Sequence, residues 1–155
     1  MANAILWDAR PSAEAVIAAD GVLKNLANAA TAISPTDVAN GTDLKTHADF
    51  LLYLHDFAAA PTAGGYFELH LIYEFTTLYG DGEDGDLAGT PRLTANTLAG
   101  IFPVYAGDED QYIQLTGVPI GPHDFRVLLV NKCGQAIPNT DGSLLNIYRY
   151  SLESQ

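Results

Sequence analysis

The feature that most constrains the fold is a ten-residue run, Tyr66–Phe75, in which side chains of two kinds alternate. The odd-numbered positions are all apolar or aromatic: Phe67, Leu69, Leu71, Tyr73 and Phe75. The even-numbered positions hold Tyr66, Glu68, His70, Ile72 and Glu74. A period of two is typical of a strand with one buried face and one wet face. The run therefore predicts a β-strand whose odd-numbered residues point into a core.

Further segments predict strands, and Gly- and Pro-rich stretches separate them. Residues 111–116 alternate in the same way, with Ile113 and Leu115 inward, while residues 48–55 and 125–130 are more continuously apolar, as strands buried on both faces tend to be. Residues 145–150 complete the set, and residues 27–33 and 99–104 are weaker candidates. Only residues 11–19 and 93–98 favour a helix, the first because Pro11 and Gly21 suit its two ends. Seven or eight short strands predict an all-β, single-domain β-sandwich, and a jelly roll is the form that we favour.

Composition excludes several classes of function. A chain of 155 residues with 48% apolar and 17% charged residues is long enough for one folded domain. Its formal net charge of −12 repels phosphate backbones, so we expect no nucleic-acid partner. We expect no membrane partner either, because no apolar run is long enough to span a bilayer and no secretory signal opens the chain. Cys133 is the only cysteine, which excludes an intrachain disulfide and leaves synthesis in the cytoplasm as the simple expectation.

The first 21 residues differ from the rest, so we expect an N-terminal arm at residues 1–21 and a sandwich domain at residues 22–155. The single tryptophan, Trp7, follows Ile5 and Leu6 in this arm. A large aromatic side chain on an arm can anchor a subunit to its neighbour, because it buries a large area at one point. The alternative is that Trp7 folds back over one end of its own sandwich. We take Ile5, Leu6 and Trp7 as candidate interface residues.

The last third of the chain resembles a known group of proteins. A Pro- and Gly-rich approach at residues 118–122 leads to an apolar strand, which ends in Asn131-x-x-Gly134-Gln135, and a final strand ends in Tyr150. This order resembles the jelly-roll cement or decoration proteins of tailed bacteriophages. Gly121 departs from the pattern, since relatives more often have consecutive prolines there. The resemblance implies a homotrimer that binds the major capsid protein on the outer surface of the virion and stabilises the coat lattice.

Tyr148 and Tyr150 fall on one face of the final strand, where they could bury in a subunit interface, stack on sugars or form the rim of the protein's own core. A carbohydrate-binding jelly-roll module of a phage head fibre or tail is therefore the alternative function, with these tyrosines as its platform.

Two clusters invite a metal or catalytic interpretation, and neither has the required spacing. Glu68, His70 and Glu74 share a strand face, but a cupin-like site needs a His-x-His pair that is missing here. The acidic run at residues 81–86 lacks the regular ligand spacing of a helix-loop-helix calcium site. We therefore expect no enzyme activity, no catalytic residues, no cofactor and no metal. A metal-dependent enzyme that uses Glu68, His70 and Glu74 stays open as the rival hypothesis.

Overall fold

A computed structural model describes residues 5–7, 13–17, 22–80, 93, 96–139 and 142–154, which form strands, turns and loops without a helix. The strands are β1 (Ile5–Trp7), β2 (Glu14–Ile17), β3 (Thr31–Ile33), β4 (His47–Leu54), β5 (Tyr66–Phe75), β6 (Leu78–Tyr79), β7 (Leu98–Pro103), β8 (Gln111–Pro119), β9 (Phe125–Lys132), β10 (Leu144–Tyr150) and β11 (Leu152–Ser154). The prediction of an all-β fold is confirmed.

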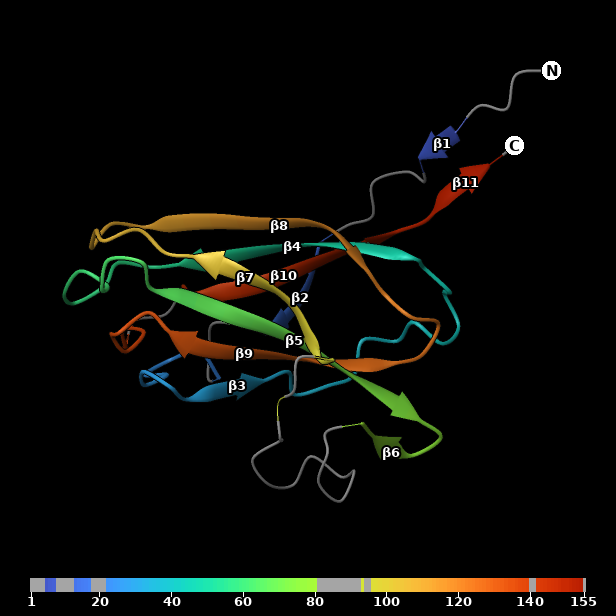
Figure 1. The fold of residues 1–155 in the computed structure, drawn as a ribbon, viewed down its shortest axis with the longest axis horizontal. Helices are drawn as coiled ribbons and strands as arrows, with labels where there is room; N and C mark the ends of the chain where they lie inside the picture. The colour runs from blue at the N-terminus through green and yellow to red at the C-terminus, as the bar shows by residue number, and fades with distance from the viewer. Residues whose placement is uncertain are drawn as a thin grey trace.

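Two antiparallel sheets stack as a sandwich, and a two-stranded ribbon lies beyond one end of it (Figure 1). The first sheet has the order β2-β10-β4-β8. The second has the order β3-β9-β5, and both β6 and β7 pair with β5. The ribbon pairs β1 with β11. From β2 to β5, and again from β7 to β10, successive strands alternate between the two sheets.

The core lies between the two sheets and takes one face of each strand. In β4 every second residue is at most 1% exposed: Ala48, Phe50, Leu52 and Leu54. The residues between them are only half-buried, so the expectation that residues 48–55 are buried on both faces was wrong. The same expectation is confirmed for β9, where Val127 and Leu129 join the core while Leu128 and Val130 are buried on the outer face.

Strand β5 follows the predicted alternation through its first half. Phe67, Leu69 and Leu71 are buried in the core, as expected. Phe75 is 52% exposed because β5 there has passed the end of the sandwich and turns back into β6. The opposite face is not uniformly wet, since His70 and Ile72 are also buried. The alternation therefore predicted the strand and its inner face, but not the burial of the outer face.

The first residues of the sandwich lie earlier in the chain than expected. Glu14–Ile17 forms an edge strand that pairs with β10, and Ile17 is completely buried in the core. The expectation that residues 1–21 precede every strand of the sandwich was wrong for this segment, and so was the helix expected there. An isolated helix of nine residues is marginal in water, whereas pairing with β10 satisfies the backbone and buries Ile17.

The segment after β9 is held by one buried side chain. The amide of Asn131 donates to the carbonyl oxygens of Leu26 and Gln135, at 3.0 and 2.7 Å, and accepts from the Cys133 amide at 2.9 Å. Gly134 has a φ of 84°, and a Cβ atom there would collide with the Thr62 side chain. The Asn-x-x-Gly-Gln pattern therefore has a structural explanation, which is the closure of this turn.

Candidate functional site

The outer face of the first sheet, which we call the tyrosine face, carries tyrosines from three neighbouring strands. Because the alternate residues point into the core, the intervening ones project outward: Tyr53 from β4, Tyr112 from β8, and Tyr148 and Tyr150 from β10. Tyr53 and Tyr112 lie opposite each other in the β4–β8 pair, and their rings stack with centroids 4.5 Å apart. The prediction that Tyr148 and Tyr150 share a face is confirmed, and that face points away from the core.

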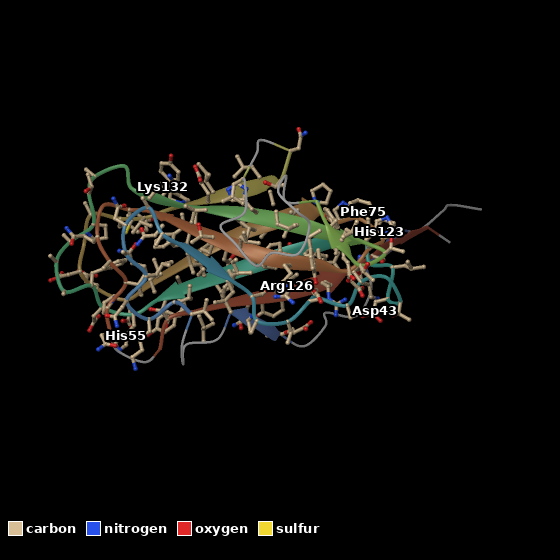
Figure 2. All side chains as sticks on the ribbon, turned by 90° about the horizontal axis from the view of Figure 1, so that it is seen from below. Asp43, His55, Phe75, His123, Arg126 and Lys132 are labelled. Carbon is tan, nitrogen blue, oxygen red and sulfur yellow. The ribbon has the colours of Figure 1, made fainter. Side chains whose placement is uncertain are left out.

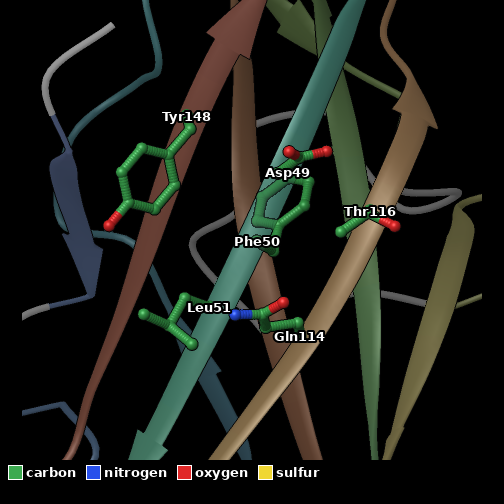
Figure 3. A pocket seen from close by; sticks show the side chains of 6 residues that line it. All are labelled: Asp49, Phe50, Leu51, Gln114, Thr116 and Tyr148. Atoms are coloured by element: carbon green, nitrogen blue, oxygen red, sulfur yellow. The ribbon is translucent and has the colours of Figure 1, made fainter. Parts of the chain in front are cut away.

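A hollow of about 170 Å³ lies in the middle of this face (Figure 3). Asp49, Phe50 and Leu51 of β4 line it together with Gln114 and Thr116 of β8 and Tyr148 of β10. The Asp49 carboxylate accepts hydrogen bonds from the Gly117 amide at 2.8 Å and the Tyr150 hydroxyl at 3.2 Å. Burial, followed by the nearby Asp49 carboxylate, raises the pKa of Tyr150, so its hydroxyl remains a donor at neutral pH. The face combines flat aromatic rings with fixed polar groups and is suited to binding rather than to acid–base chemistry.

The candidate interface residues of the N-terminus lie in the ribbon, not in a free arm. Ile5 is opposite Ser154, Leu6 is opposite Glu153, and Trp7 is opposite Leu152. The structure thus pairs two segments from opposite ends of the chain, which no sequence pattern predicted. Neither Tyr148 nor Tyr150 belongs to the ribbon, although β10 leads directly into β11.

The end of the sandwich from which the ribbon extends, which we call the ribbon end, also exposes large apolar side chains. Leu44, Phe75 and Leu78 are 57%, 52% and 59% exposed. Figure 2 shows Phe75 close to His123 at this end, while His55 lies near the opposite end. The Thr46 amide donates to the Tyr150 carbonyl oxygen at 3.2 Å, which ties the loop that carries Leu44 to the end of β10. The ribbon end therefore presents one exposed apolar residue from the loop before β4 and two from the β5–β6 hairpin of the other sheet.

The predicted cluster of Glu68, His70 and Glu74 is not assembled as a metal site. The carboxylate of Glu68 lies 3.6 Å from Nε2 of His70, and Thr97 Oγ1 lies 2.9 Å from its Nδ1. Burial lowers the pKa of His70, with Glu68 opposing the shift, so a neutral imidazole is favoured. Glu74 lies toward the end of β5, where it pairs with Tyr79. The acidic run at residues 81–86 lies outside the described residues.

Among the described residues, the close group of three possible metal ligands is a different one, at the end of the sandwich opposite the ribbon. Nδ1 of His55 and the carboxylates of Asp56 and Asp110 lie within 4.8 Å of one another. Asp110 also accepts a hydrogen bond from the Tyr53 hydroxyl at 2.7 Å and from the Asp56 amide at 3.1 Å. These contacts, with the Tyr53 bond the largest, lower the pKa of Asp110 from 3.8 to about 2. The same bond raises the pKa of Tyr53 well above its usual value.

Sequence reasoning missed this group because His55 and Asp110 are distant in the chain. The sequence pattern that could have indicated the group is the short run Tyr53-x-His55-Asp56 at the end of one predicted strand, together with Asp110 just before the start of another. Only the pairing of β4 with β8, in which Leu54 is opposite Gln111, brings the two together.

Comparison with protein-family models and with curated proteins found no match to this sequence. Within the described part of the chain, no helix is long and apolar enough to cross a membrane.

Proposed function

We propose that this chain is a virion structural protein, a decoration subunit that binds the major capsid protein on the outer surface of a bacteriophage head. The observation that carries the proposal is the ribbon end, where β1 pairs with β11 and where Leu44, Phe75 and Leu78 are exposed. Covering the exposed half of a side chain such as Phe75 or Leu78 contributes roughly 1 kcal/mol, because full burial is worth about 1.5–3 kcal/mol. Several such residues and a ribbon together make a surface suited to a protein partner.

The fold supports the same proposal. The chain passes repeatedly between two antiparallel sheets, β2-β10-β4-β8 and β3-β9-β5-β7, and this alternation supports a jelly roll. The resemblance of the last third of the chain to phage decoration proteins points to the same architecture. We therefore propose a jelly-roll subunit whose role is binding and not catalysis. A subunit that binds only the assembled lattice stabilises it by mass action.

We further propose that the subunit is a homotrimer and that Tyr148 and Tyr150 of the tyrosine face contribute to the contact between its copies. Tyrosine is enriched at protein interfaces because its ring supplies apolar area while its hydroxyl finds a polar partner. Tyr148 and Tyr150 lie on this face, next to the strand that leads into the ribbon.

The test is co-sedimentation of the purified protein with phage heads that lack it. Deleting residues 1–7 or residues 152–155 removes one partner of the β1–β11 pair, so both deletions should weaken binding to the same extent, by thirtyfold or more. Both deletions retain β2, and far-UV circular dichroism should show an intact β fold. Tyr105→Ser is the matched control at the opposite end and should bind as the unaltered protein does. Full-strength binding by both deletion variants would contradict the proposal.

The second candidate function is carbohydrate binding by a phage head-fibre or tail module. The hollow in the tyrosine face favours it, because Tyr148, Asp49 and Gln114 offer a ring, a carboxylate and an amide to one ligand. A glycan array with the isolated protein separates the two functions. Binding of a glycan that Tyr148→Ala abolishes, without retention on heads, would favour the carbohydrate-binding module.

A further inference from the structure

A larger hollow, of about 520 Å³, lies at the end of the sandwich opposite the ribbon. We call it the distal hollow. The β7–β8 loop and the start of β8 line it, with Tyr105, Glu109, Asp110, Gln111 and Tyr112 as its side chains of chemical interest. Tyr105 and Tyr112 are 76% and 67% exposed, so two aromatic rings remain available in one concavity. The length of strand β4, about 23 Å for eight residues, separates the distal hollow from the ribbon end.

The distal hollow is held in shape by a buried side chain. Gln111 is 6% exposed, and its Oε1 atom accepts a hydrogen bond from the Tyr105 amide at 2.9 Å. Its Nε2 atom donates to the carbonyl oxygens of Tyr105 and Gly107, both at 3.1 Å. The loop is therefore held at Tyr105 and Gly107 before any ligand binds, which lowers the cost of ordering it on binding.

The aromatic and acidic walls are fixed as well. The ring of Tyr112 stacks on that of Tyr53, whose hydroxyl donates to the Asp110 carboxylate at 2.7 Å. Asp110 is ionised at neutral pH, and Glu109 lines the same hollow while Asp56 lies beside it. The residues that line the hollow include carboxylates but no lysine or arginine. Electrostatics therefore favours a cation over an anion or a neutral molecule.

A second tyrosine–carboxylate pair in the same chain shows which cation binds to this arrangement of groups. On the second sheet, the Tyr79 hydroxyl donates to the Asp37 carboxylate at 2.8 Å, as Tyr53 does to Asp110. There the guanidinium of Arg126 lies 5.5 Å from the centre of the Tyr79 ring, and its Nε atom lies 2.9 Å from Asp37. A guanidinium is planar, stacks on aromatic rings and donates in a fork to carboxylates, which a lysine ammonium does not.

We infer that the distal hollow binds an arginine side chain of a partner protein, with the guanidinium against the rings of Tyr105 and Tyr112 and its N–H groups directed at Glu109 and Asp110. The inference is independent of capsid binding, because it concerns the opposite end of the sandwich. A subunit attached through its ribbon end would display this hollow outward, where it could bind a second protein.

The test is a titration of the ¹⁵N-labelled protein with Nα-acetyl-arginine amide, followed by NMR shifts of the backbone amides, with EDTA present to exclude divalent cations. The matched probe is Nα-acetyl-citrulline amide, which has nearly the same shape without the charge. We expect arginine to shift residues 105–112 with a millimolar Kd, and citrulline to bind at least tenfold more weakly. Higher salt should weaken the arginine complex.

Substitutions in and beside the distal hollow test whether arginine binds there. Tyr105→Ser and Glu109→Gln should each weaken arginine binding about threefold to fivefold, because each removes one cation–π or charged contact. Asp108→Asn removes the same charge from the same loop but outside the lining of the hollow, so it should have a smaller effect than Glu109→Gln. Equal shifts with citrulline, unchanged affinity in both lining variants, or tighter binding of neutral methyl glycosides would each overturn the inference.

Discussion

Replacing Asn131 by alanine should destabilise the fold more than a typical surface substitution, although Asn131 touches no proposed binding surface. Its side chain is completely buried and takes part in three hydrogen bonds that close the segment after β9. Alanine leaves the Cys133 amide without this acceptor, at a cost of about 1–3 kcal/mol for a buried unsatisfied group. The carbonyl of Leu26 still accepts from the Ile137 amide, and that of Gln135 still accepts weakly from the Cys133 thiol, so their losses are smaller.

The expected loss is therefore about 2–4 kcal/mol, a large share of a total stability of about 5–15 kcal/mol. Urea unfolding followed by circular dichroism measures it, and the midpoint should fall while the slope m stays constant. Asn139→Ala is the matched control, since Asn139 is exposed and accepts one hydrogen bond from Asn25; it should change stability by about 0.5 kcal/mol or less. A loss below about 0.5 kcal/mol for Asn131→Ala, with m unchanged, would refute the structural explanation of the Asn-x-x-Gly-Gln pattern.

Three further predictions test other parts of the structure. Ile17→Ala should lower the free energy of unfolding in urea by about 2–5 kcal/mol, because Ile17 is fully buried. Glu14→Ala, at an exposed position, should lower it by about 1 kcal/mol or less. Equal effects would contradict the placement of β2 in the sandwich. The carboxyl of Asp110 should titrate by NMR with a pKa of about 2, and Tyr53→Phe should raise it toward 3.8. Since the folded pKa is the lower one, the stabilisation by Asp110 is complete above its ordinary pKa and is lost as the pH falls toward 2. Light scattering coupled to size exclusion should give three times the chain mass of 16.5 kDa. A monomeric mass at micromolar concentration would contradict the proposed trimer.

The alternating segments were predictable from sequence because the side-chain period of a strand is a local property. Tyr66–Phe75 forms a strand as alternation predicted, and the predicted residues 111–116 lie within β8. Phe67, Leu69 and Ile113 point into the core as expected. The two faces of a strand were harder to assign. Whether His70 is wet or buried depends on what lies over the outer face of the sheet, and no pattern within β5 contains that information.

Pairing between distant segments could not be read from the sequence. Glu14–Ile17 has a composition that suits a helix, and only the open edge of β10 makes it a strand. The grouping of Tyr53, His55 and Asp110 likewise depends on the register between β4 and β8. The pairing of Trp7 with Leu152 joins the two ends of the chain, which no local signal predicts.

Cryo-electron microscopy of phage heads that have been mixed with the purified protein tests the central proposal most directly. The account predicts added density at regular positions on the outer surface of the head, into which the sandwich fits with its ribbon end against the coat and the distal hollow facing solvent. Heads without added density, or density that fits only with the distal hollow against the coat, would contradict it.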